Sequence, residues 1–147
     1  MYTEAIELKP DDATAYRNLG VVQARFNDFG AAIASTKKAM ACNPKLADAY
    51  DYLGYFYIET GSLDSAMESF SKCLDLDNKA WNAKLGLALV YFKSNDTVNA
   101  TTYLTQARED EPRLSKGMEG IAELESVVFS YSEKIKETIR KLFDATK

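Results

Sequence analysis

The side chains of this sequence that could carry out chemistry are two cysteines and one short run of acidic residues. Neither Cys42 nor Cys73 lies in a Cys-x-x-Cys spacing, and both fall inside apolar stretches. We therefore expect buried, reduced thiols at both positions. The chain has no histidine, which removes the usual general base, the common nucleophilic triads and the commonest metal ligand.

The acidic run Glu109-Asp110-Glu111 directly precedes Pro112, at the expected end of a helix. A metal site there would need more converging oxygen ligands than this run supplies, so we interpret it as a solvated helix end. No glycine-rich phosphate loop is recognisable, because the segment from Gly54 to Gly61 lacks a Gly-Lys-Ser/Thr ending. The sequence predicts no enzyme, no cofactor and no metal site.

The overall charge argues against two classes of partner. The net charge is −4 over 147 residues, whereas proteins that bind nucleic acid usually present a basic face that neutralises phosphates. An acidic chain also gains no attraction to an anionic membrane, and no apolar run approaches the length of a membrane span. The first residues lack the features of a signal peptide. We expect a cytoplasmic protein, or a fragment of a longer one.

The elements that must position any site repeat every 34 residues. This step connects Tyr16 with Tyr50; Leu19, Leu53 and Leu87; Gly20, Gly54 and Ala88; and Ala32, Ala66 and Ala100. Within a unit the tyrosine, the leucine and the small residue after it fall at i, i+3 and i+4, as Tyr16, Leu19 and Gly20 do. This spacing predicts one face of an amphipathic helix. A glycine inside a helix costs about 1 kcal/mol relative to alanine. Small residues that recur at one place therefore indicate that a second helix passes close by.

The predicted turns follow the same step. Residues that tolerate a left-handed conformation and end a helix recur at Asn27, Gly61 and Asn95. Good N-cap residues come directly after these three positions, at Asp28, Ser62 and Asp96, and the same 34-residue step leads on to Ser130. Ser130 and Glu133 also fit a capping box. Each unit is therefore predicted to contain a helix, a tight turn, a second helix and a short loop.

These residues resemble the tetratricopeptide repeat, whose pattern joins an aromatic residue, Leu-Gly, Tyr, and later Ala, Phe, Ala and Pro. The second unit lies nearest to that pattern, with Tyr50, Leu53, Gly54, Tyr57, Ala66, Phe70 and Cys73. The first and third units depart from it at Thr36 and Lys84, where an aromatic residue is usual. Three consecutive units in register, over residues 13 to 114, carry the resemblance.

The resemblance implies an all-α fold, a right-handed α-solenoid of antiparallel helical hairpins. We expect one domain with repeats at residues 13–46, 47–80 and 81–114. Residues 1–12 would be the second helix of a truncated repeat, and residues 115–147 a degenerate repeat or capping helices.

Both ends are expected to differ from the central repeats. A half-repeat at the N-terminus would leave Tyr2 and Ile6 on an uncovered apolar face, which suggests self-association that a sedimentation concentration series would test. At the C-terminus we expect a helix from about 114 to 129, with Met118, Ile121, Ala122 and Val128 inward. A second helix from about 131 to 145 would bury Ile135, Ile139 and Leu142 and present a charged, solvated face.

In this family the first helix of each hairpin lines a concave groove that binds extended peptides or helices. The resemblance implies a partner-binding groove formed by Arg17, Arg25, Asp48, Asp51, Tyr55, Glu59, Asn82, Leu85 and Phe92. Tyr55 and Phe92 are the candidate anchors, because aromatic residues dominate interface hot spots. Leu89 and Phe92 have a second interpretation, as residues packed between neighbouring helices.

The known carboxylate clamp of chaperone-binding members is a poor match. Its positions hold Arg17, Val21, Tyr52, Asn82 and Gly86, of which only Arg17 keeps a suitable charge. Asp48 and Asp51 lie nearby and would repel a carboxylate tail.

Three functions follow, in order of preference. The first is an adaptor or scaffold that binds a peptide or helix of an unidentified protein partner in the groove. The second is a scaffold that assembles with itself through the open N-terminal face. The third is a regulatory segment of a larger enzyme whose catalytic domain lies outside this chain.

Overall fold

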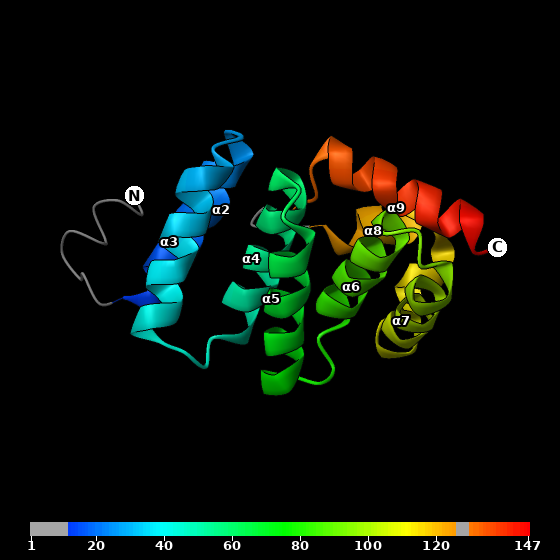
Figure 1. The fold of residues 1–147 in the computed structure, drawn as a ribbon, viewed down its shortest axis with the longest axis horizontal. Helices are drawn as coiled ribbons and strands as arrows, with labels where there is room; N and C mark the ends of the chain where they lie inside the picture. The colour runs from blue at the N-terminus through cyan, green and yellow to red at the C-terminus, as the bar shows by residue number, and fades with distance from the viewer. Residues whose placement is uncertain (1–11, 126–129) are drawn as a thin grey trace. The chain divides into compact units, whose positions relative to one another are not determined.

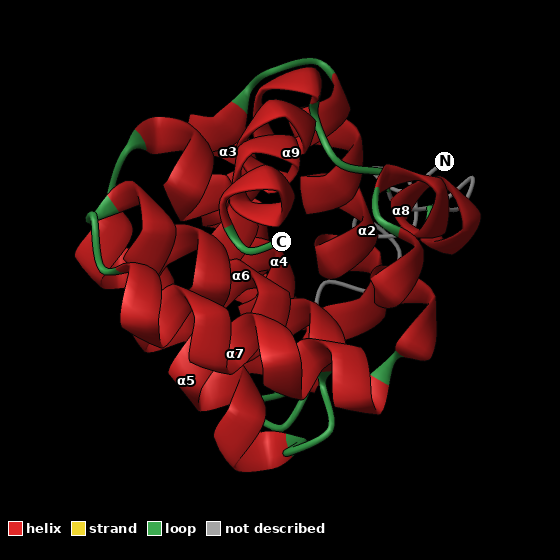
Figure 2. Cartoon of the chain, turned by 90° about the vertical axis from the view of Figure 1, so that its right-hand side faces the viewer, coloured by secondary structure: helices red, strands yellow, loops and turns green. Residues whose placement is uncertain are grey.

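The computed structural model describes residues 12–125 and 130–147 (Figure 1). Every regular element in these residues is a helix, and they include no strand (Figure 2). The predicted all-α class is therefore confirmed. The chain divides into two compact units, residues 1–77 and residues 78–147.

The first unit contains two stacked helical hairpins. Helix α2 (Ala13–Arg25) packs against α3 (Phe29–Cys42), and α4 (Ala47–Thr60) packs against α5 (Leu63–Leu76). The two hairpins join chiefly where α4 packs on α3, with a smaller contact between α4 and α2. The inner layer of the core consists of small and aromatic side chains, including Ala32, Ala66 and Phe70, that are 0% exposed.

The tight turns have the predicted left-handed backbone. Asn27 has φ 60°, Asn95 has φ 63° and Gly61 has φ 80°. Asp28 and Asp96 cap the helices that follow, accepting hydrogen bonds from the backbone N–H groups of Ala31 at 3.2 Å and Asn99 at 3.1 Å. Ser62 occupies the same position before α5 but makes no side-chain capping hydrogen bond.

Two of the recurring glycines lie where helices cross closely. A Cβ atom added to Gly20 would lie 2.6 Å from the Thr36 hydroxyl and 3.1 Å from the Ala32 carbonyl oxygen on α3. A Cβ atom at Gly54 would lie 2.4 Å from the ring of Phe70 on α5. The repeat therefore keeps small residues at this position because the second helix of the hairpin fills the space.

The second unit begins with a third hairpin. Helix α6 (Trp81–Lys93) packs against α7 (Thr97–Asp110). A short 3-10 helix, η1 (Pro112–Lys116), follows and packs against α7 and against α8 (Met118–Leu124). The last helix, α9 (Glu133–Ala145), packs against α6.

The predicted long helix over about 114–129 is wrong. Gly117 has φ 69° and ψ −142°, a conformation that favours glycine, and it separates η1 from α8. The chain then folds back on itself and brings α8 close to η1. A Cβ atom at Gly120 would lie only 1.8 Å from the Arg113 carbonyl oxygen, so this close approach requires glycine. Ile121 is buried as expected, but Ala122 is exposed, and Val128 lies outside the described residues.

The final helix buries the predicted stripe but begins later than expected. Ile135, Ile139 and Leu142 are buried in α9. Ser132, and not Ser130, is the N-cap, and its hydroxyl accepts a hydrogen bond from the Ile135 N–H at 3.1 Å. The predicted capping box from Ser130 is therefore wrong, because Ile135, and not Glu or Gln, lies three residues after the N-cap Ser132.

The two cysteines differ in environment. Cys73 is 1% exposed in α5, as predicted, whereas Cys42 at the end of α3 is exposed, which contradicts the expectation of two buried thiols. Burial, reinforced by the charge of nearby Asp51, raises the pKa of the Cys73 thiol to about 12. Tyr2 and Ile6, the residues of the predicted self-association face, lie outside the described residues.

No helix within residues 12–125 and 130–147 is long and apolar enough to cross a membrane.

Gly54→Ala is expected to lower the free energy of unfolding by about 1–3 kcal/mol, because the added methyl group meets the fully buried Phe70 ring. Gly30→Ala is the matched control, since nothing lies within 4 Å of a Cβ atom there. The control should be neutral or gain up to about 1 kcal/mol from helix propensity. Urea denaturation of both variants measures the difference, and equal effects would contradict the close approach.

The thiols should differ in reactivity. At pH 8 in the native state, Cys42 is expected to react with a disulfide reagent and Cys73 to react much more slowly, because Cys73 is buried and its raised pKa leaves little of the reactive thiolate. Both should react at similar rates in denaturant. Equal native rates at the two positions would show that α5 does not shield Cys73.

Candidate partner-binding surface

The first helices of the two hairpins in the first unit, α2 and α4, are joined by a charged pair. The Arg17 guanidinium lies 2.6 Å from the Asp48 carboxylate, and the two side chains are 19% and 48% exposed. Arg17 also donates to the Asn18 side-chain oxygen from Nε at 3.3 Å and from Nη2 at 3.1 Å. This guanidinium therefore links two helices and is already paired, so it is not a free cation available to a ligand carboxylate.

Two other predicted groove residues of α4 are buried. Tyr55 is 2% exposed, and its ring packs edge-on against Phe70 with 5.0 Å between ring centroids. Asp51 is 7% exposed. The structure thus places the proposed anchor Tyr55 inside the fold, where Phe70 fills the space above Gly54 and reaches the Tyr55 ring.

Four charged side chains of α2 and α4 remain accessible. Arg17 and Glu59 are partly exposed, and Arg25 and Asp48 are exposed. They include both signs of charge in equal number. We call these four residues of α2 and α4 the polar inner face.

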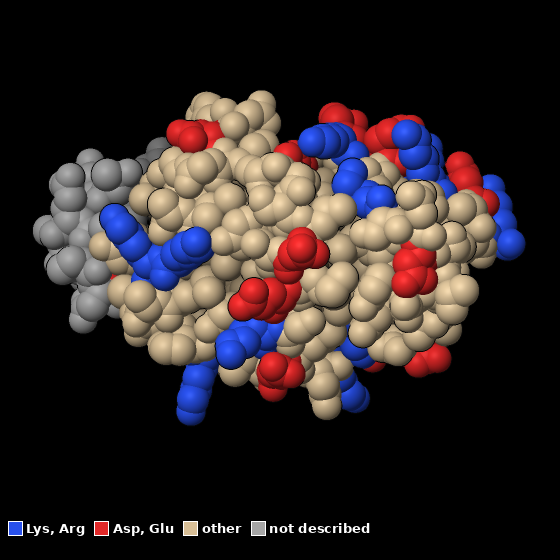
Figure 3. Space-filling model, in the orientation of Figure 1, with Lys and Arg blue, Asp and Glu red and all other residues tan. Residues whose placement is uncertain are grey.

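The opposite side of the first unit is formed by α3 and α5, which lie toward the viewer in Figure 3. Lys37 and Lys38 are exposed on α3, and Asp64 and Glu68 are exposed on α5. Basic and acidic side chains both lie on this side (Figure 3). These exposed positions provide natural controls for the polar inner face.

In the second unit the predicted groove residues of α6 are either buried or only partly exposed. Leu85 and Leu89 are 0% exposed, so the packed interpretation applies to Leu89. Asn82 is partly exposed, and its side-chain oxygen accepts a hydrogen bond from the Tyr131 hydroxyl. Phe92 is partly exposed. The residue that sequence reasoning missed is Tyr131, which precedes the last helix and carried no signal of its own.

The acidic run at the end of α7 has structural partners. The Asp110 carboxylate pairs with the Lys84 ammonium on α6, and their side chains are only 18% and 13% exposed. Glu111 caps η1 and accepts from the Arg113 Nε at 2.8 Å, and this hydrogen bond lowers the pKa of the Glu111 carboxyl. Interpreting the whole run as a solvated helix end was wrong for Asp110. The ion pair with Asp110 also explains why Lys84 is tolerated at a position where the family usually has an aromatic residue, since Asp110 neutralises the Lys84 charge across the hairpin.

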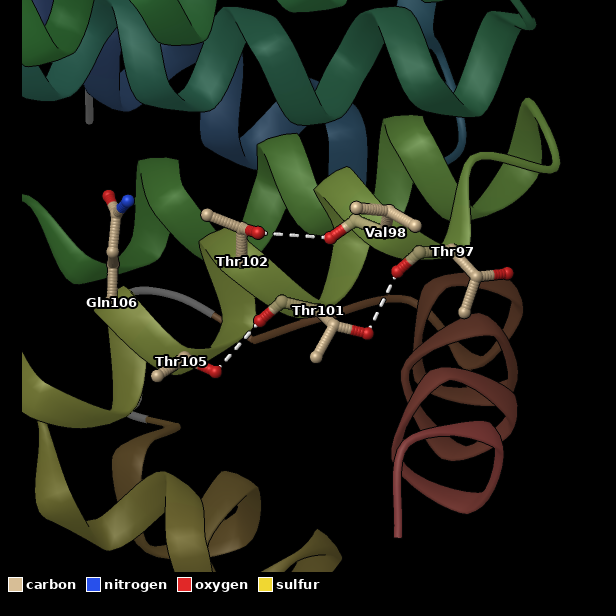
Figure 4. Close-up of a pocket in the computed structure, with 6 residues that line it drawn as sticks. All are labelled: Thr97, Val98, Thr101, Thr102, Thr105 and Gln106. Carbon is tan, nitrogen blue, oxygen red and sulfur yellow. Dashed lines mark hydrogen bonds between the residues drawn. The ribbon is translucent and has the colours of Figure 1, made fainter.

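A shallow hollow lies on the outer side of α7 (Figure 4). It is lined by Thr97, Val98, Thr101, Thr102, Thr105 and Gln106. The hydroxyl groups of Thr101, Thr102 and Thr105 each donate to the backbone carbonyl four residues earlier, at 2.8–3.0 Å. These donors are used within the helix, so the hollow offers no converging set of polar groups.

Within the described part of the chain, no group of three or more Cys, Asp and Glu side chains is placed to hold a metal ion.

Comparisons with known families give one consistent result. Models of the tetratricopeptide repeat family match residues 1–47 and residues 47–79. The human mitochondrial import receptor subunit TOM70 is 30% identical over 77 residues, which are 52% of this chain and 13% of that protein. A small glutamine-rich tetratricopeptide repeat-containing protein 2 from Mycosarcoma maydis is 30% identical over 87 residues, 59% of this chain and 25% of that protein. The chain thus matches only a minor part of each relative.

Solved structures share the fold over most of the chain. A crystal structure of MamA has a TM-score of 0.70 and 29% identity, and the match covers 78% of this chain and 67% of that chain. A crystal structure of YrrB, described as a TPR protein with an unusual peptide-binding site, has a TM-score of 0.69 and 25% identity, covering 82% and 70%. These similarities identify the α-solenoid architecture.

Asp110→Ala is expected to lower the free energy of unfolding by about 1–3 kcal/mol, because it leaves the mostly buried Lys84 ammonium without its partner. Asp144→Ala is the control: Asp144 pairs with Lys147 at 3.3 Å, but their side chains are 63% and 79% exposed. That exposed pair should contribute less than about 1 kcal/mol. Thermal unfolding of both variants distinguishes them, and an equal loss would mean that burial does not strengthen the Lys84 pair.

Proposed function

The chain belongs to the tetratricopeptide repeat family, and from this premise we propose that it is an adaptor or scaffold that binds a peptide or helix of a partner protein. Repeats of this family are protein-interaction modules, and their function depends on the side chains of the helices that line the binding surface. The expected compartment is the cytoplasm.

The observation that carries the proposal is the polar inner face of α2 and α4. Its side chains come from two successive hairpins, and rigid helices hold them at fixed spacing. A face built this way can recognise a peptide through several hydrogen bonds and ion pairs at once. Arg17, Arg25, Asp48 and Glu59 are the proposed contact residues in this unit.

The predicted groove residues that are buried are not proposed to contact the partner. Asp51, Tyr55 and Leu85 support the inner helices from within. Asn82 and Phe92, both partly exposed on α6, are the proposed contacts in the second unit. Because Arg17 and Asp48 already neutralise each other, the partner segment is expected to be polar and to carry both signs of charge.

A second candidate is a regulatory segment of a larger enzyme whose catalytic domain lies outside this chain. The chain spans 13% of the length of TOM70 and 25% of the length of the Mycosarcoma maydis relative. The proposed binding surface would have the same task in a regulatory segment as in an adaptor, which is to bind a peptide or helix.

A photo-reactive benzophenone amino acid placed at position 48 is expected to cross-link a partner protein in extracts of the source cell. The matched control carries the same amino acid at position 68, where Glu68 is exposed on α5. Cross-links from position 48 that are absent at position 68 support binding at the inner face. The proposal fails if position 68 captures the same proteins, or if position 48 captures none in repeated extracts.

The same cross-link should weaken as salt rises, because screening reduces the attraction between exposed charges within a Debye length of about 8–10 Å. A cross-link that is unchanged between low and high salt would indicate an apolar contact instead of the polar one proposed here.

A further inference from the structure

The last helix of the chain does not continue the stack of hairpins. In the first unit, the first helix of the second hairpin, α4, packs chiefly on α3, the second helix of the hairpin before it. Helix α9 instead packs on α6, the first helix of its neighbouring hairpin. Its main partner is therefore a first helix, the kind of helix that lines the binding side in this family, and not a second helix as in the stacking of α4.

The contact with α6 is on the predicted groove stripe. The Tyr131 hydroxyl, just before α9, donates a hydrogen bond to the side-chain oxygen of Asn82. Asn82 shares its helical stripe with Leu85 and Leu89, three and seven residues further on, and both leucines are 0% exposed. Of the side chains expected to meet an external peptide in the third repeat, Asn82 is thus already in contact with Tyr131, Leu85 and Leu89 are buried, and Phe92 is partly exposed.

Helix α9 has the properties of a helical ligand. Its buried residues, Ile135, Ile139, Leu142 and Phe143, fall at i, i+4, i+7 and i+8 and form one stripe. The remaining surface is charged, including exposed Glu137, Arg140 and Lys141. Grooves that bind helices recognise apolar anchors at this spacing.

The attachments of α9 to the rest of its unit are polar at one end and aromatic at the other. Lys136 pairs with Glu125 at 3.2 Å, and the Tyr131 N–H donates to the Glu125 carboxylate at 2.9 Å. The Arg108 guanidinium of α7 lies 5.2 Å from the centre of the Phe143 ring. Each is an interaction that a second helix of similar sequence could replace.

We propose that α9 is a tethered ligand that occupies the binding side of α6, and that the external partner of this side is an amphipathic helix that displaces it. The inference deepens the proposed function by naming the partner class for the third repeat. That partner helix carries apolar residues at the α9 spacing and a tyrosine four residues before the first of them, as Tyr131 precedes Ile135.

A tethered ligand competes at a high effective concentration, on the order of millimolar for a short connection. It lowers the apparent affinity of any external helix by the fraction of chains in which α9 is displaced. Weakening α9 must therefore strengthen binding of the external helix, which a purely structural capping helix would not do.

The test uses the full chain and a fluorescent synthetic peptide of residues 130–147. In one variant, Ile139→Gln and Leu142→Gln remove two fully buried anchors of α9 while keeping a residue that favours helix. The matched control, Arg140→Gln and Lys141→Gln, makes the same replacements at adjacent exposed positions. We expect the peptide to bind the first variant at least about tenfold more tightly than it binds the native chain or the control.

A second measurement tests the contact itself. In the Ile139→Gln, Leu142→Gln chain, a peptide with Tyr131→Phe should bind about 2- to 12-fold more weakly than the native peptide, as expected for one neutral hydrogen bond. Adding Asn82→Ala to the chain should abolish that difference between the two peptides.

Two results overturn the inference. One is that the peptide binds all three chains equally or binds none of them. The other is that the first variant loses cooperative thermal unfolding, as followed by circular dichroism of the whole chain, which makes α9 part of the core. If the peptide does not bind the first variant more tightly while a source-cell partner still cross-links at position 48, only this inference is wrong. If the peptide succeeds and position 48 captures nothing, the proposed function falls instead.

Discussion

The close crossing of the two helices in each hairpin is the constraint on which the rest of the structure depends. At Gly54 the Phe70 ring occupies the space where a side chain would be, and at Gly20 the Thr36 hydroxyl and the Ala32 carbonyl do so. A helix that approaches this closely buries the whole facing stripe, so Ala32, Ala66 and Ala100 are each 0% exposed. The 34-residue step exists because each hairpin must repeat the same crossing to stack on its neighbour.

That constraint determines which side chains are left for function. Phe70 enters the space above Gly54 and brings Tyr55 into the core, which removes an aromatic residue from the α4 surface. The accessible side chains of the inner helices include four charged ones, and two of these, Arg17 and Asp48, form an ion pair that joins α2 to α4. In the third hairpin the same logic leaves an apolar stripe on α6, and the chain places Tyr131 and α9 against it.

Much of the fold followed from sequence because it depends on local rules and on repetition. The left-handed turns at Asn27, Gly61 and Asn95 and the caps at Asp28 and Asp96 are set by residue type within a few positions. Periodicity identified the close crossing at Gly20 and Gly54, although it could not show that Phe70 and Thr36 are the residues that fill the space.

The remainder depends on contacts between distant residues that no repeat encodes. The break at Gly117 was missed because the apolar spacing from 114 to 128 resembles one continuous helix, whereas the fold requires a reversal at Gly120. The pair of Lys84 with Asp110 joins residues 26 apart, and the Tyr131 contact with Asn82 joins residues 49 apart. Stripe assignment also failed for Tyr55, since a rotation of about one residue around the helix separates surface from core and the position of Phe70 decides between them.

The proposed function requires that partners bind the inner helices of the first unit. Hydrogen exchange of the chain alone and in complex with its captured partner tests this claim most directly, because bound backbone amides open less often. We expect added protection in residues 13–25 and 47–60 that exceeds any change in residues 29–42 and 63–76. Protection confined to the second set, on α3 and α5, would contradict it.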